Sequence, residues 1–177
     1  EDAKAFYYYI PVPKKGDNWD THIQDKPFEF NMKMSGPATM IGSSQSDLQV
    51  QYSTTVDSKA TIGDPLYYNN KDNYVDADKI SDWSTVKMLR ISAKDTVTEI
   101  PNNAEIKIYL HYEAEKATSA LVGSVVNFGP CGYTPYTVGN EENGGHMPLP
   151  HIQAEFQTGI IEGKIFVDRN FNGVYDE

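Results

Sequence analysis

The chain has 177 residues, of which 39% are hydrophobic, which suffices for the core of one domain with some residues to spare. Its 15 Lys and Arg oppose 25 Asp and Glu, and the net charge of -10 argues against binding to nucleic acid or anionic lipid, because both attract cationic surfaces. No apolar run approaches the ~20 residues of a membrane-spanning helix, so we expect no membrane insertion, and the single cysteine, Cys131, excludes a disulfide within the chain.

Apolar and polar residues alternate with a period of two over much of the chain, which is the spacing of a strand with one buried face. The alternation slips once in the strand expected at 83–93, which indicates a bulge, and the segment 121–128 is apolar on both faces. In chain order, we expect strands at residues 6–10, 28–34, 48–53, 83–93, 105–112, 121–128, 152–156 and 160–167.

Clusters of Gly, Pro and Asn separate these segments and predict turns or loops. They lie at residues 15–18, 35–37, 63–65, 101–103 and 139–145. Only 76–83 and 113–121 could hold a short helical turn. Seven or eight short strands punctuated in this way predict an all-β fold, an antiparallel Ig-like or prealbumin-like β-sandwich. We expect one domain at 1–160 and, at 161–177, the truncated start of a second domain.

The last residues carry the pattern of a calcium-binding loop. Calcium takes six to eight oxygen ligands at ~2.3–2.6 Å, and oxygen-bearing groups at every second residue can wrap around it. The predicted ligands at loop positions one, three, five, seven and nine are Asp168, Asn170, Asn172, the backbone carbonyl of Val174, and Asp176. Position twelve lies beyond residue 177, so we expect weak affinity here. The alternative is that Asn172 and Gly173 form a type I′ hairpin turn.

A strand, and not an amphipathic helix, is predicted before this loop. The combination resembles the opening of the B-type repeats of Gram-positive cell-surface adhesins of the serine-aspartate repeat class. The matching residues are Gly163, Ile165, Phe166, Asp168, Asn170, Asn172, Gly173 and Asp176. The resemblance implies a calcium-stabilised, prealbumin-like β-sandwich that begins near residue 161.

The larger part of the chain also resembles the sandwich modules that precede B-type repeats in anchored surface proteins. Residues 10–19, 51–54 and 82–87 carry this looser likeness. It implies an extracellular location on the cell surface, with anchoring to the cell wall in the full-length protein, and it transfers no functional residues.

Histidine and cysteine show no spacing typical of a catalytic or zinc site. His146 and His151 flank a Pro-containing stretch, and we expect both to be structural or solvated. Cys131 has no neighbouring base or cation in sequence, so we expect an inert thiol. Four aspartates between residues 72 and 82 could bind a second calcium, but their spacing fits no known loop, and a solvated acidic loop is the main expectation.

Tyrosine is abundant, with 12 residues, and two interpretations remain open. Exposed rings could stack on sugars or form a protein-binding hot spot, whereas strand tyrosines commonly pack in cores. The likeness to surface proteins also admits a Lys–Asn or Lys–Asp isopeptide bond. Lys33, Lys87 and Lys107 lie in strand-like segments, but the sequence identifies no partner for them.

These observations predict a non-catalytic structural or adhesive module that spaces or presents a binding surface on a bacterial cell. The expected partner is a host or neighbouring-cell surface protein or glycan, and we expect the chain to be a monomer. The alternative is a carbohydrate-binding module of a secreted glycan-active enzyme, which the tyrosine content suggests. An enzyme with two carboxylates brought together in space is a third hypothesis, for which the sequence selects no pair.

Overall fold

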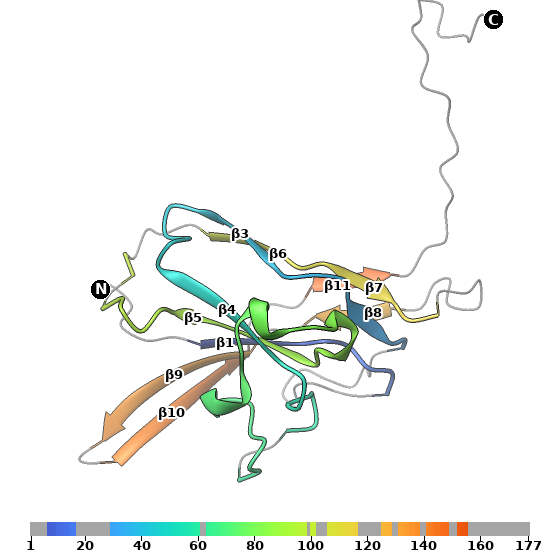
Figure 1. The fold of residues 1–177 in the computed structure, drawn as a ribbon. Helices are drawn as coiled ribbons and strands as arrows, with labels where there is room; N and C mark the ends of the chain where they lie inside the picture. The colour runs from blue at the N-terminus through green and yellow to red at the C-terminus, as the bar shows by residue number, and fades with distance from the viewer. Residues whose placement is uncertain are drawn as a thin grey trace, which may run out of the picture.

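A computed structural model describes residues 7–16, 29–60, 63–98, 100–101, 106–116, 125–128, 131–138, 141–148 and 152–155 (Figure 1). Within these residues the fold is all-β: every strand pair is antiparallel, and the helical segments are three short 3-10 helices. None of the described helices is long and apolar enough to cross a membrane. The all-β class predicted from sequence is therefore confirmed.

A five-stranded sheet forms the centre of the molecule, with the strand order β10-β9-β1-β5-β4. Its strands are β1 (Tyr7–Pro11), β4 (Leu48–Ser53), β5 (Met88–Ala93), β9 (Cys131–Val138) and β10 (Glu141–Pro148). Strand β5 lies between β1 and β4, and its residues 88–92 are all buried. Burial on both faces explains why the sequence of β5 lacks a simple alternation.

A second antiparallel ribbon runs over the central strands (Figure 1). In it, β2 (Met32–Met34) pairs with β7 (Tyr112–Ala114), and β3 (Thr39–Gly42) pairs with β6 (Ile106–Tyr109). Between these two pairings, one side of the ribbon has four residues, 35–38, whereas the other side has only two, 110–111. The regular pairing is therefore interrupted there. A separate pair joins β8 (Val125–Phe128) to β11 (Ile152–Glu155).

Hydrophobic cores cover both faces of the central sheet. The aliphatic core, which faces the ribbon, consists of Val12, Met34, Tyr52, Val86 and Leu89. The aromatic core lies on the opposite face and is closed by the segment 54–75; it consists of Tyr9, Val56, Tyr68, Tyr74 and Met88. Each fully buried aliphatic side chain contributes ~1.5–3 kcal/mol relative to exposure, so both cores stabilise the sheet.

The strand expected at 83–93 is shorter than predicted, because β5 begins only at Met88. Residues Trp83–Thr85 form the 3-10 helix η3, and the Asp82 side chain accepts a hydrogen bond from the Ser84 amide at 3.0 Å. This local cap competes with an extended backbone. The predicted helical turn at 76–83 is present as η2 (Ala77–Lys79) and the start of η3.

Three other expectations were wrong in part. The predicted strand at 105–112 is two strands, β6 and β7, separated by the mismatch at residues 110–111. The predicted loop at 139–145 is instead occupied from residue 141 by β10, in which Gly144 pairs with Pro135 of β9. Of the helical turn predicted at 113–121, residues 113–114 belong to β7.

Candidate functional site

The predicted calcium loop lies outside the described residues. Its five ligands, Asp168, Asn170, Asn172, Val174 and Asp176, fall in the segment 156–177, as does the second domain expected at 161–177. The loop therefore stays a prediction from sequence. The expected strand at 160–167 and His151 also lie outside the described part of the chain.

Three of the four aspartates between residues 72 and 82 act as local hydrogen-bond acceptors or ion-pair partners. Asp76 accepts from the Gln51 amide at 3.1 Å, and Asp78 pairs with Lys79 at 2.9 Å. Two hydrogen bonds from Ser84 hold the pKa of the Asp82 carboxyl below its ordinary value. Across the ranges that the structure describes, no three His, Cys, Asp or Glu side chains gather as a metal site.

A buried arginine lies on the face of the central sheet that the aromatic core covers. Arg90 is only 6% exposed, and its guanidinium carbon lies 5.1 Å from the ring centroid of Tyr74 and 5.7 Å from that of Tyr7. Its Nη2 donates a hydrogen bond to Oε1 of Gln51, whose Nε2 in turn donates to Asp76. A neutral amide thus connects a buried cation to an exposed carboxylate, and each hydrogen bond polarises the other.

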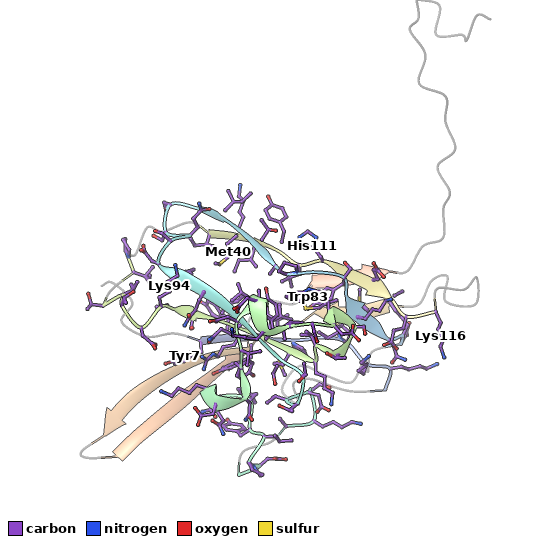
Figure 2. All side chains as sticks on the ribbon, in the orientation of Figure 1. Tyr7, Met40, Trp83, Lys94, His111 and Lys116 are labelled. Atoms are coloured by element: carbon purple, nitrogen blue, oxygen red, sulfur yellow. The ribbon has the colours of Figure 1, made fainter. Side chains whose placement is uncertain are left out.

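The strand register places these groups in one row. Tyr9 on β1, Arg90 on β5 and Gln51 on β4 are direct cross-strand partners, so their side chains project to the same face of the sheet. Tyr7 follows two residues away on the same face (Figure 2). Among the described residues, the buried Nε of Arg90 has no hydrogen-bond acceptor, so burial of this cation carries a cost in the folded protein.

The segment 54–75 closes the aromatic core with its own rings. Tyr68 meets Tyr9 edge-on at 4.9 Å, and the Tyr74 hydroxyl donates to the Tyr68 carbonyl at 2.6 Å. Burial, followed by the neighbouring Tyr9, raises the pKa of Tyr74 well above its ordinary value. Tyr9, Tyr68 and Tyr74 are therefore core-packing residues. Of the two interpretations that the tyrosine content left open, exposed binding surface or core, the second holds for these three.

The outward face of the β3–β6 ribbon carries the most exposed large hydrophobic side chains of the described residues. Ile41 is 54% exposed and Tyr109 is 50% exposed. Thr39 pairs with Tyr109 across the ribbon, and its Oγ1 lies 3.3 Å from Nε2 of His111. Figure 2 shows Met40 and His111 on this ribbon, away from the Tyr7 side of the molecule. We call Thr39, Ile41, Lys107, Tyr109 and His111 the outer face.

The remaining sequence candidates are distributed over several strands. Cys131 on β9 pairs with Tyr9 and Pro148, whereas His146 on β10 pairs with Tyr133, so these two candidates are not cross-strand partners. Lys33 lies in an ion pair with Glu113 at 3.3 Å, where both side chains are partly exposed. This is not the apolar setting that an isopeptide bond requires.

Sequence reasoning missed both the Arg90 centre and the outer face. A signal existed for the first, since Arg90 interrupts the apolar run of β5. The pairing with Gln51, 39 residues earlier, depends on strand order and could not be read locally. No family model, no curated protein and no solved structure matches this chain, so function has to be inferred from its own residues.

Proposed function

We propose that this chain is an Ig-like β-sandwich module of a cell-wall-anchored or secreted Gram-positive surface protein, with a non-catalytic, structural or adhesive role. One observation supports the proposal: the central sheet and the ribbon, both antiparallel, contribute side chains to a common core, and the ribbon leaves Ile41 and Tyr109 exposed. Leu89 and Tyr52 of the central sheet meet Met34 of the ribbon in this core. Packing of two such faces is the basis of a sandwich.

The outer face is the proposed binding surface. Tyrosine supplies a large contact area at a small cost in conformational entropy, and an apolar centre with a polar rim is typical of binding sites. Tyr109 and Ile41 supply that centre, and Thr39, Lys107 and His111 supply polar groups around it. The proposed partner is a host or neighbouring-cell surface protein or glycan.

The segment 161–177 is proposed to open a calcium-binding B-type repeat of the adhesin class that it resembles. Asp168, Asn170, Asn172, Val174 and Asp176 would supply the ligands. In this proposal calcium stiffens the junction between the module and the repeat, so that the outer face is held away from the cell surface. The location that follows is extracellular.

The carbohydrate-binding alternative receives less support. Its basis is the tyrosines at 7–9 and 67–68, together with Tyr133 and Tyr136, whose side chains lie outside the described part of the structure. Of the others, Tyr9 and Tyr68 are buried against each other, and Tyr9 also packs against Tyr74. Rings in a core cannot stack on a sugar. Among the residues whose burial the structure describes, Tyr109 is an exposed aromatic residue that still could.

The test is a binding screen against a glycan array and an array of extracellular-matrix proteins, with two matched variants. Tyr109→Ser removes the ring at the outer face, and Leu66→Ser removes a side chain that is 41% exposed elsewhere. We expect binding to at least one arrayed molecule, weakened at least fivefold by Tyr109→Ser and unchanged by Leu66→Ser. Equal binding by both variants, or hydrolysis of an arrayed glycan, would contradict the proposal.

A further inference from the structure

The two strands β3 and β4, which are joined by a turn, are unusually poor in charged residues. Residues 35–56 include β3 and β4 and carry a single charged residue, Asp47, in a chain that is 23% charged. Both strands are sheet edges: β4 ends the five-stranded sheet, and β3 has β6 as its one neighbour among the described residues. Protein edges are normally protected by charges, prolines or a covering segment, because unpaired backbone groups recruit other strands.

The two edges differ in their protection. At β4, Tyr52 exchanges two backbone hydrogen bonds with Val75, at 2.8 and 2.9 Å, so the segment 54–75 covers that end. No described segment covers β3 in this way, and Ile41, in the middle of β3, is 54% exposed. The edge of β3 is therefore both uncharged and open within the described structure.

The β3 edge is also held in place. Lys94 fixes the turn between β3 and β4 from the neighbouring strand, since its Nζ donates to the Ser46 carbonyl at 2.6 Å and its amide to the Asp47 carbonyl at 2.8 Å. Pairing with β6 fixes the other side of β3. A preorganised edge loses little conformational entropy when a further strand is added.

We propose that β3 is a self-pairing edge, to which a second copy of this chain adds its own β3 in antiparallel orientation. A second copy is the occupant that presents the same uncharged edge. Two molecules of net charge -10 repel each other over most of their surfaces, but the stretch 35–46 carries no charged residue, so two β3 edges can approach without facing like charges. Antiparallel pairing of two identical edges is two-fold symmetric, so every contact is made twice.

The register of this pairing follows from the outer face. Both copies present the same face outward when Ile41 lies opposite Ile41 of the second copy. Thr39 is the direct partner of Tyr109, so Ile41 lies diagonal to Tyr109 within each ribbon. These four side chains, two from each copy, then lie near one another across the pair, and Lys107, the direct partner of Ile41, flanks the two isoleucines on either side.

The pairing is weak because β3 has only four residues. Such a contact buries far less than the ~1,200 Å² at the lower end of stable interfaces. The chain is therefore a monomer when dilute and pairs when its local concentration is high, as on a densely covered surface. This inference goes beyond the proposed function and holds whether or not the outer face binds a foreign partner.

Sedimentation of the purified chain alone, from micromolar to millimolar concentration, tests the pairing. We expect reversible dimerisation with a Kd on the order of 0.1–1 mM. Ile41→Lys weakens it at least tenfold by placing like charges at the two-fold axis, whereas Leu66→Lys, the matched control at another exposed hydrophobic residue, leaves it unchanged. Thermal unfolding confirms that each variant folds.

A cross-linking measurement checks the register. With Cys131 replaced by Ser, Ile41→Cys is expected to form a disulfide-linked dimer at least tenfold faster than Leu66→Cys under the same oxidant. The proposal is overturned if the chain sediments as a monomer at every concentration, if dimerisation survives Ile41→Lys, or if both cysteine variants cross-link at equal rates. None of these results depends on binding to an array.

Discussion

Replacing Gln51 is predicted to destabilise the protein more than removing the arginine that Gln51 serves. Gln51→Leu deletes the described acceptor of the Arg90 Nη2 and leaves a guanidinium that is 6% exposed with a second unsatisfied donor group. A hydrogen bond to a charged group is worth ~1.5–3 kcal/mol, and the lost bond to Asp76, at the surface, adds little. We expect Gln51→Leu to lower the free energy of unfolding by about 2–3 kcal/mol.

Removing the cation has a smaller expected effect. Arg90→Met loses the contacts with Tyr7 and Tyr74, each worth ~0.5–2 kcal/mol, but it also removes a buried charge whose Nε has no acceptor. These effects oppose each other, and we expect a net loss below about 1.5 kcal/mol. In the double variant Gln51→Leu/Arg90→Met no charge is left unsatisfied, so its stability should match that of Arg90→Met.

The measurement is urea unfolding of the four proteins, followed by tryptophan fluorescence, to which Trp83, whose ring centroid lies 4.9 Å from that of Tyr52, contributes. Because the double variant should be as stable as Arg90→Met, the expected coupling free energy equals the whole effect of Gln51→Leu, ~2–3 kcal/mol. In thermal unfolding, Gln51→Leu should lower Tm by ~5–10 °C, since ~1 kcal/mol corresponds to ~2–4 °C at this chain length. Strictly additive single effects would refute the reasoning, because they would show that Arg90 does not depend on Gln51.

Two further predictions concern tyrosine hydroxyls. Tyr52→Phe leaves the Ala38 amide without its 2.8 Å acceptor and should cost ~1–2 kcal/mol in urea unfolding, and an unchanged midpoint would disprove the link between β4 and the ribbon. Burial raises the pKa of Tyr74 and of Tyr112, so above pH ~10 the unfolded chain releases protons that the folded chain keeps. The contribution of these two hydroxyls to stability is then constant below that pH and falls above it by ~1.4 kcal/mol per pH unit for each tyrosine. Tyr74→Phe should flatten this fall, and an unaltered slope would contradict the assignment.

The sequence predicted strands where apolar residues alternate with polar ones or gather in a short aromatic run. Residues 48–53 alternate in sequence and form β4, and the aromatic run after residue 6 forms β1. The prediction failed where neighbours in space override local preference. The glycine-rich stretch after residue 139 predicts a loop, but pairing with β9 along its length makes it β10. Glycine has no strong backbone preference of its own, so a sequence window cannot show which outcome prevails.

The candidate surfaces were harder to predict than the strands. Ile41 lies between Met40 and Gly42, so no alternation marks a strand or a buried face there, and its exposure depends on which face of the ribbon turns outward. Arg90 depends on a partner in another strand. A low density of charge, as in residues 35–56, was the one sequence signal of an interaction edge, and it becomes meaningful only when both strands are known to be edges.

The assignment to a calcium-linked surface module is tested most directly by terbium luminescence, excited through the tyrosines of the chain. Tyr175 lies within the predicted loop and is placed to sensitise a bound ion. We expect a saturable signal that calcium displaces with a weak affinity of about 1 mM, and that Asp168→Ala abolishes. Asp78→Ala changes the charge equally at the 3-10 helix η2 and should leave the signal intact. Identical curves for the two variants, or a signal that calcium does not displace, would contradict the account.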